Sequence, residues 1–214
     1  MKELITMLIY LTSQILWAAD NKIPVALFSH SELSGWEDKV FNGKTLYHLK
    51  KDGKVTILLA DSRQAASGLV KKQKIDLYQT PFINWRWKVI KPVFSVDEKS
   101  RGGDDYAARV YVIVSGGWAF WKTKAINYVW SSSQKRGEVW ENAYAGKNAM
   151  MVAVKGKMAR TGQWYLEKRN IREDFKRITG EDVRYIDAVA IMTDTDDTQS
   201  HAIAEYGNIY FTQN

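Results

Sequence analysis

Beyond residue 20, apolar and polar residues alternate with a period of two along much of the chain, which is the period of a β-strand with one buried face. The clearest case is FINWRWKVI, residues 82–90, where Trp85 and Trp87 share one face with two aliphatic residues. We expect both tryptophans in the core, together with Trp130. Similar runs predict further strands at residues 106–115, 125–130, 148–155, 162–169, 185–193 and 206–213.

A β-hairpin is predicted at residues 44–62, where two strand-like runs flank the pair Asp52-Gly53. An Asp-Gly pair suits the tight primed turns that join antiparallel strands, because glycine adopts a positive φ without strain. The hairpin therefore indicates antiparallel pairing early in the chain.

One segment has a helical period instead and predicts a short helix over residues 171–179. Asn170 is a suitable N-cap, Glu173 stands where a capping box prefers an acid, and Gly180 suits the end of the helix. Three apolar residues at spacings of four and three would face the sheets: Ile171, Phe175 and Ile178.

Many short strands, turn signals between them and a single helix predict a mainly β protein, an antiparallel β-sandwich or jelly-roll. A closed barrel is the alternative. The sequence shows no internal repeat and contains only three prolines, so residues 20–214 are interpreted as one domain.

The first residues have the order of a secretory signal peptide, expected over residues 1–19. Lys2 precedes an apolar run of about 14 residues, which is short of the ~20 that a membrane-spanning helix needs. Ala18 and Ala19 then precede a polar residue. We expect a periplasmic or secreted protein, with an uncleaved N-terminal anchor as the alternative and no transmembrane segment after cleavage.

Composition limits the chemistry further. The chain has no cysteine, which excludes thiol catalysis, cysteine-bound zinc and c-type haem attachment. Its nine tryptophans and eleven tyrosines fill β cores or stack on sugars. The net charge of +7 either attracts anionic envelope polymers or only maintains solubility. No nucleic-acid-binding motif is present, so nucleic acid is not an expected partner.

An acidic loop, TDTDDT, follows the predicted strand 185–193. Asp194 and Asp196 have the spacing of the first calcium ligands of an EF-hand, but Gln199 stands where that loop needs glycine, and strands flank it. Calcium bound in another geometry, by Asp194 and Asp196, stays an alternative. A solvated turn is another.

Strand parity places Asp194 on the face of Met192 and Ala190, which is apolar and expected to be buried. A carboxylate at the end of a buried face needs a cation, an arginine or backbone donors. Because arginines are available in this chain, we expect arginine and backbone donors ahead of calcium, with Asp197 as the most solvated aspartate of the loop.

Arg109 is the one charged residue in the β-rich run 106–115, and a buried arginine needs a partner. Asp105 lies on the same strand face as Arg109, so Asp105 or an acidic-loop aspartate is the expected partner. Arg86 and Arg169 occupy comparable positions in their strands. Such arginines form either a structural ion-pair network or a site for an anionic or sugar ligand.

An enzyme is the less favoured interpretation, and no catalytic residue is predicted. Glycoside hydrolysis needs two carboxylates about 5–10 Å apart, and four aspartates are available for such a pair: Asp104, Asp105, Asp194 and Asp196. The three histidines have no metal-binding spacing, and Ser67 lacks the flanking glycine of a hydrolase nucleophile elbow.

Several motifs in a fixed order resemble the DUF3047 family, bacterial exported proteins with a domain of unknown function. The motifs include GWEDKVFNGKTLY, LADSRQAASGL, FINWRWKV, GGDDYAARVYVIV and EKRNIREDFKR. The resemblance covers about residues 28–211 and implies no established reaction. The C-terminal AEYGNIYF is also similar to the last strand of galactose-binding-like β-sandwiches, a weaker likeness at the level of the fold.

Together these features favour an exported, non-catalytic protein that binds a saccharide or an anionic envelope polymer. The predicted ligand-binding residues are Arg86, Asp105, Arg109, Asn127, Arg169, Asp194 and Asp196. The alternatives are a glycan-active hydrolase that uses a carboxylate pair and a structural envelope protein with no small ligand.

Overall fold

Residues 22–119 and 122–214 are described by a computed structural model, and within them the strands form two sheets. Sheet 1 has six strands in the order β11-β6-β13-β4-β3, with β1 paired to β13. Its strands are β1 Ile23–Ala26, β3 Leu46–Asp52, β4 Val55–Arg63, β6 Phe82–Lys91, β11 Tyr165–Asn170 and β13 His201–Thr212.

Sheet 2 has seven strands in the order β2-β5-β12-β7-β8-β10-β9. Its strands are β2 Trp36–Asn42, β5 Ala66–Asp76, β7 Arg109–Val114, β8 Lys124–Trp130, β9 Val139–Asn142, β10 Gly146–Lys155 and β12 Tyr185–Asp194. The pairs are antiparallel apart from the parallel pair β8 and β10. The helix α1, Ile171–Thr179, joins β11 of sheet 1 to the segment that leads into β12 of sheet 2.

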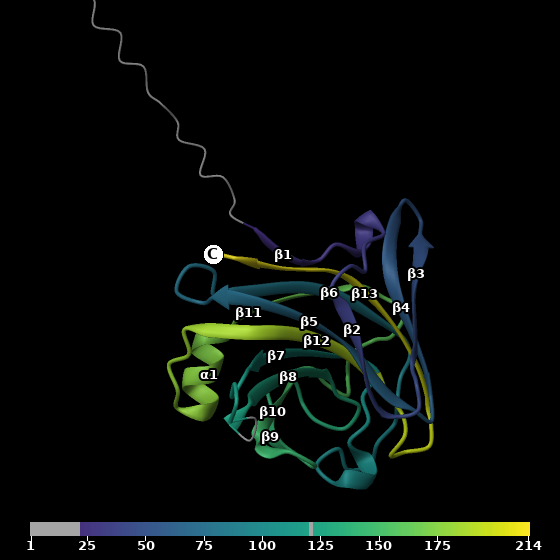
Figure 1. The fold of residues 1–214 in the computed structure, drawn as a ribbon. Coiled ribbons are helices and arrows are strands. Elements are labelled where there is room, and N and C mark those ends of the chain that lie inside the picture. The colour runs from purple at the N-terminus through teal and green to yellow at the C-terminus, as the bar shows by residue number, and fades with distance from the viewer. Residues whose placement is uncertain (1–21, 120–121) are drawn as a thin grey trace, which may run out of the picture.

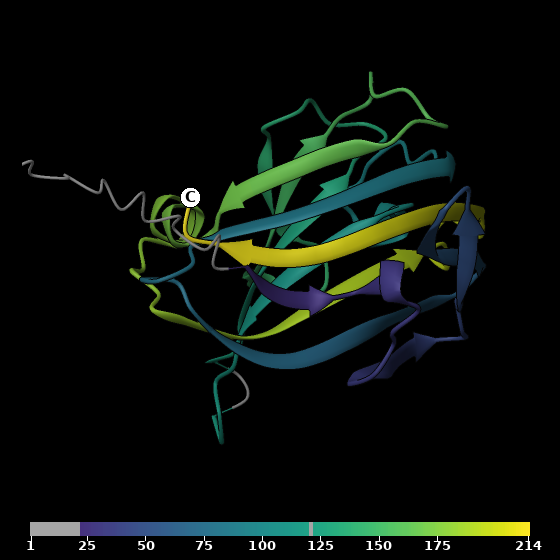
Figure 2. The ribbon, with the colours of Figure 1, turned by 90° about the horizontal axis from the view of Figure 1, so that it is seen from above.

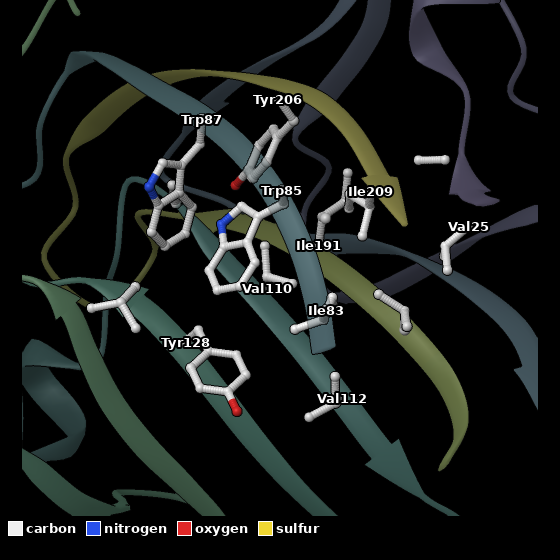
Figure 3. Packing of buried hydrophobic residues seen from close by; sticks show 14 of the residues in the cluster. Val25, Ile83, Trp85, Trp87, Val110, Val112, Tyr128, Ile191, Tyr206 and Ile209 are labelled. Carbon is white, nitrogen blue, oxygen red and sulfur yellow. The ribbon is translucent and has the colours of Figure 1, made fainter. Parts of the chain in front are cut away.

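The two sheets pack face to face and enclose one large apolar core (Figures 1 and 2). Trp85 and Trp87 of β6 extend from sheet 1 toward Tyr128 of β8 in sheet 2, as Figure 3 shows. The Trp85 and Tyr128 ring centroids are 5.5 Å apart, and both residues are at most 2% exposed. Burial of such large rings on facing sheets is the main force that holds a sandwich together.

The predicted fold is confirmed: the described part of the chain is mainly β, with two sheets and one α-helix. The described strands do not form a closed barrel, because both sheets keep edge strands, among them β11 and β3 in sheet 1 and β2 and β9 in sheet 2. On β6 the apolar positions from Ile83 to Val89 are buried, as the alternation predicts. Trp130 is also buried.

The helix begins and ends where its signals predict. Asn170 accepts a hydrogen bond from the Glu173 backbone N–H at 3.1 Å, and Gly180 ends the helix with a φ of 77°. Ile171 and Phe175 are fully buried against the sheets. One turn differs in detail from the prediction. In the β3–β4 hairpin, Asp52 pairs with Val55, so Gly53 and Lys54 form the two-residue loop.

The signal peptide expected over residues 1–19 lies outside the described residues. Within residues 22–119 and 122–214, no helix is both long and apolar enough to cross a bilayer.

Candidate functional site: a polar pocket on the outer face of sheet 2

β12 sends its side chains alternately to the core and to the outer face of sheet 2. Val189 and Ile191 belong to the core between the sheets. Met192 lines a pocket on the opposite face, and so does Asp194, the last residue of the strand. Asp194 is 3% exposed, which confirms that it points inward along a buried face. That face belongs to the pocket and not to the core between the sheets.

Strand register brings residues from distant parts of the chain to this face. Met192 of β12 pairs with Arg109 of β7, and Tyr111 of β7 pairs with Asn127 of β8. Side chains of directly paired residues point to the same side of a sheet. The register therefore gathers Arg109, Tyr111, Asn127 and Met192 on one surface.

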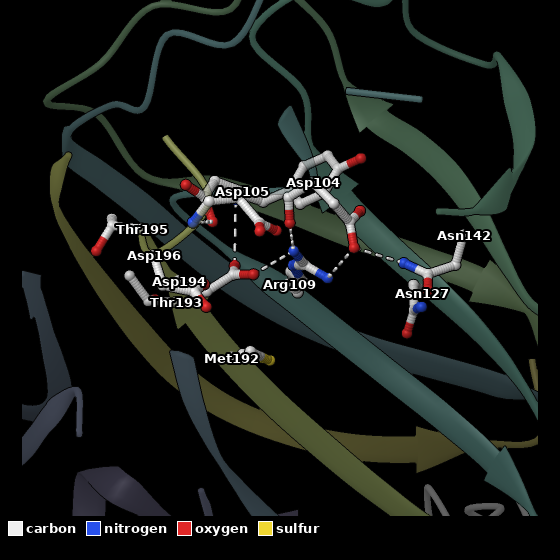
Figure 4. A network of polar contacts seen from close by, with 12 residues as sticks. Asp104, Asp105, Arg109, Asn127, Asn142, Met192, Thr193, Asp194, Thr195 and Asp196 are labelled. Carbon is white, nitrogen blue, oxygen red and sulfur yellow. Dashed lines mark hydrogen bonds and ion pairs between the residues drawn. The ribbon is translucent and has the colours of Figure 1, made fainter. Parts of the chain in front are cut away.

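The pocket has a volume of about 460 Å³. Its polar lining consists of Asn42, Asp104, Arg109, Asn127, Asn142, Asp194, Asp196 and Asp197. Its apolar and aromatic lining consists of Phe41, Ala66, Tyr111, Tyr144, Ala145, Ala149 and Met192. Figure 4 shows the polar side chains converging from β7, β8, β9 and the end of β12.

Arg109 lies at the centre of the network and is 3% exposed. Its guanidinium forms an ion pair with Asp194 and donates to the backbone carbonyl of Asp104. The Asp104 carboxylate lies 3.8 Å away, and the guanidinium stacks over the Tyr106 ring at 4.2 Å. Tyr111 accepts a further hydrogen bond from Nη1 at 3.2 Å. The expected pairing of Arg109 with an acidic-loop aspartate is confirmed.

Burial and the surrounding charges act against each other in this cluster. Burial alone lowers the pKa of Arg109, but the Asp194 carboxylate raises it well above the usual range. Burial raises the pKa of Asp194, and the Arg109 guanidinium opposes that rise. Burial likewise raises the pKa of Asp104, against the effect of Arg109 and of the Asn142 amide.

Asp105 is fully buried but is not the partner of Arg109. Its carboxylate accepts hydrogen bonds from the Thr198 backbone N–H at 2.6 Å, from the Thr198 hydroxyl and from the Asp197 backbone N–H at 3.3 Å. Asp105 therefore holds the acidic loop in place from behind, and it does not line the pocket.

Three residues that line the pocket each have one buried polar atom with no hydrogen-bond partner among the described residues: Asp104 Oδ1, Arg109 Nε and Asn127 Oδ1. Asn127 is 1% exposed, and its amide nitrogen donates to the Met151 sulfur at 3.2 Å. A buried polar group without a partner costs about 1–3 kcal/mol. Because such groups are few in folded proteins, each one calls for an explanation, such as a functional role or a bound water or ion.

The rim of the pocket carries carboxylates and an aromatic ring. Asp196 accepts a hydrogen bond from the Asn42 amide at 3.2 Å, and Asp197 accepts one from the Tyr144 hydroxyl. Both aspartates are half-buried. Burial and the neighbouring carboxylates Asp196 and Asp105 raise the pKa of Asp197, and the bond from Tyr144 opposes the rise. The same bond raises the pKa of Tyr144 to about 12.

Carboxylate oxygens of Asp105, Asp194 and Asp196 lie within 4.8 Å of one another, a separation that a hard cation could bridge. However, Asp194 already accepts from Arg109 and from the Tyr106 backbone N–H at 3.1 Å. Asp105 accepts from the acidic loop. The partners of Asp194 are thus the arginine and backbone donors that we expected ahead of calcium.

Two predicted site residues lie elsewhere, so the expectation of one cluster is wrong for them. Arg86 lies on the outer face of sheet 1, where its side chain crosses Gly207 and stacks over the Trp164 ring at 4.6 Å. Arg169 pairs with Asp174 next to α1. The misplacement arises because strand parity identifies a face within one strand but not the sheet to which that strand belongs.

The sequence interpretation missed Asn142 and Tyr144 in the turn after β9. Asn142 donates to the Asp104 carboxylate at 2.7 Å, and its own oxygen accepts from the Tyr144 and Ala145 backbone N–H groups. This is an Asx-type turn, and the pattern Asn-Ala-Tyr-Ala-Gly is its signal in the sequence. The turn presents Tyr144 at the rim, where it is 56% exposed.

The family described as "Protein of unknown function (DUF3047)" matches residues 34–210. The chain belongs to this family. No curated protein matches the sequence of this DUF3047 protein.

Several solved structures are similar to this chain at low identity. The carbohydrate recognition domain of Emp47p has a TM-score of 0.46 and 9% identity, with 92% of this chain and 96% of that one covered. TmCBM61 in complex with β-1,4-galactotriose has a TM-score of 0.41 and 9% identity, covering 87% and 94%. The glycoside hydrolase domain of Endo-D from Streptococcus pneumoniae R6 has a TM-score of 0.41 and 10% identity. That match covers 84% of this chain but only 22% of the Endo-D chain. Such low values transfer neither a ligand nor a reaction.

Proposed function

We propose that this DUF3047 protein binds a saccharide in the pocket on the outer face of sheet 2 without altering it. The observation that carries the proposal is that three residues lining an open pocket each keep a buried polar atom with no partner among the described residues. Two are acceptors, Asp104 Oδ1 and Asn127 Oδ1, and one is a donor, Arg109 Nε. Sugar hydroxyls donate and accept together, so they can satisfy both kinds.

The size and rim of the pocket support the same proposal. A volume of about 460 Å³ lies within the range of small-ligand sites. The rings of Phe41 and Tyr144 are 64% and 56% exposed at its edge. Exposed rings beside polar groups suit sugars, which present apolar C–H faces as well as hydroxyls.

The hydrolase alternative rests on the raised pKa of Asp104, which suits a general acid. A second, available carboxylate is also needed. Asp194 shares the Arg109 guanidinium with Asp104, but it is paired with that guanidinium and held by the Tyr106 backbone N–H. We therefore favour binding over hydrolysis, and incubation with each bound glycan should leave the glycan length unchanged. Shortened products would establish the hydrolase instead.

The binding proposal is tested on a glycan array with a fragment of residues 20–214, with and without EDTA. We expect retention on at least one glycan class, unaffected by EDTA. Asn127→Leu should weaken binding about tenfold or more, because the ligand hydrogen bond to Oδ1 is lost. Asn84→Leu, on the outer face of sheet 1, is the matched control and should bind normally. Absence of retention on every glycan would refute the proposal, and so would normal binding by Asn127→Leu.

We also propose that the protein is exported, on the basis of the apolar run and the Ala18-Ala19 pair in the sequence. Mass spectrometry of the protein from its native host should find a mature N-terminus near Asp20. Recovery of the chain with Met1 from the cytoplasmic fraction would contradict export.

A further inference from the structure

The pocket has a charge opposite to that of the protein as a whole. The chain carries a net charge of +7. Among the charged residues that line the pocket, however, four are aspartates, and Arg109 is the single cation. The aspartates are Asp104, Asp194, Asp196 and Asp197. An anionic ligand would therefore meet local repulsion although the protein as a whole is basic.

Arg109 does not neutralise the negative charge of the rim residues Asp196 and Asp197. It already contacts Asp194 and Asp104. Asp196 and Asp197 accept hydrogen bonds from the neutral groups of Asn42 and Tyr144, and neither forms an ion pair with a described lysine or arginine. The rim thus keeps two half-buried carboxylates whose charge is not neutralised by direct contact.

The two aromatic rings at the rim already attract cations. Lys39 lies over the Phe41 ring with its ammonium 5.8 Å from the centroid, and the Arg101 guanidinium lies 5.3 Å from the centroid of Tyr144. Neither cation lines the pocket. These contacts indicate that the edge of the pocket favours positive charge through the ring faces as well as through the carboxylates.

Two of the three unpartnered atoms are acceptors, and they provide the second observation. Asp104 Oδ1 and Asn127 Oδ1 each lack a donor among the described residues, and their residues, which line the pocket, are 4% and 1% exposed. An ammonium group supplies three hydrogen-bond donors and no acceptor, whereas a carboxylate or sulfate supplies no donor. The buried acceptors and the rim carboxylates therefore both favour a ligand group that donates hydrogen bonds and carries a positive charge.

We propose that the pocket recognises a saccharide that carries a free, protonated amino group, as in a hexosamine unit whose nitrogen is not acetylated. This inference rests on the proposed saccharide binding and narrows it to cationic glycans. Asp104 and Asn127 receive donors of the bound sugar, and the Asp196 and Asp197 carboxylates stabilise its charge. Anionic envelope polymers are excluded from this pocket by the same carboxylates.

The test compares three oligosaccharides of equal length and linkage by calorimetric titration at neutral pH. They are a β-1,4-linked glucosamine oligomer, its fully N-acetylated form and the corresponding neutral glucan. We expect the free-amine oligomer to bind at least about tenfold more tightly than the other two, with a preference that declines as salt is added. Equal or weaker binding of the amine form, including no binding by any of the three, would overturn the inference. Saccharide binding itself is judged separately, by the glycan array.

A double variant and a control test whether the rim carboxylates cause the preference for the amine oligomer. The double variant Asp196→Asn/Asp197→Asn keeps an acceptor for Asn42 and for Tyr144 but removes both charges. We expect about a tenfold loss of affinity for the amine oligomer and little change for the acetylated one. Asp182→Asn, which removes an exposed carboxylate paired with Arg172 on α1, is the control and should keep the preference. An amine preference retained by the double variant, with an unchanged melting temperature, would contradict the assignment.

Discussion

Two Arg–Asp clusters, each centred on a buried aspartate, lie on opposite faces of sheet 2, and β8 contributes to both through consecutive residues. Tyr128 points into the core, where its hydroxyl donates to Asp174 at 2.7 Å. Arg169 donates to the same carboxylate through Nε at 2.8 Å, and Arg177 adds a bond at 3.0 Å. No buried polar atom of these residues lacks a partner. This cluster is closed, and it fastens the first turns of α1 to the sheets.

The Arg109 cluster on the other face also joins an arginine to a buried aspartate, but some of its polar atoms have no hydrogen-bond partner within the described part of the chain. Asp194 and Asp174 are each 3% exposed and each pairs with an arginine. Around Arg109, however, three residues that line a pocket each have a polar atom without a described partner. The closed cluster is therefore explained by its structural role alone, whereas the unused hydrogen-bonding capacity beside the pocket is what motivates the binding proposal.

The largest effect is expected from removing the cation of the open cluster. Arg109→Met leaves Asp194 and Asp104 buried without their partner, which typically costs about 3–5 kcal/mol. Urea denaturation measures the loss. Arg63→Met is the matched control, because Arg63 forms an exposed pair with Asp61 and its removal should cost at most about 1 kcal/mol. An unchanged stability of Arg109→Met would mean that the guanidinium is solvated.

Breaking the closed cluster should affect stability and not binding. Asp174→Asn keeps an acceptor for Tyr128 but removes the charge that pairs with Arg169 and Arg177. Because these two arginines are partly exposed, we expect a loss of about 2 kcal/mol. Calorimetric titration of the folded variant should give the saccharide affinity of the unmodified protein. A loss of affinity together with stability would show that the two clusters are not independent.

The unpartnered amide oxygen of Asn127 predicts a gain in stability, in contrast to the losses expected for Arg109→Met and Asp174→Asn. Asn127→Leu replaces a buried amide whose oxygen has no partner by an apolar side chain of similar size. We expect the free energy of unfolding to rise by about 1 kcal/mol while saccharide binding weakens. Thermal and urea melts measure the first effect. A strong destabilisation would indicate that Asn127 is a structural residue like those around Asp174.

The smallest effect concerns pH. Because the folded-state pKa of Asp197 is raised, its ionisation disfavours the folded state once the pH rises above 3.8, the ordinary value of an aspartate. Asp197→Asn should therefore stabilise the protein at neutral pH by about 0.5 kcal/mol, a small value because the residue is partly exposed. The gain should disappear below pH 3.8, where the carboxyl is protonated in both states. An equal gain at both pH values would point to a cause other than charge.

Much of the fold was predictable from local pattern. Alternation identified β6, and the Asn170 and Gly180 caps identified α1, because each signal lies within a few neighbouring residues. Other strands were missed. β2 carries half-buried and exposed side chains at a sheet edge, so it has no apolar face to display. β5 carries the run Lys71–Lys74, which hides its buried half.

Residue type and strand parity are enough to establish that Arg109 must be partnered and that Asp194 ends a buried face. The tertiary structure brings the two residues together, since their pairing spans 85 positions and depends on the β7–β12 register. It also separated Arg86 and Arg169 from them and added the Asn142–Tyr144 turn. Sheet order and register are global outcomes of core packing, and no local pattern in this chain encodes which outer face becomes a pocket.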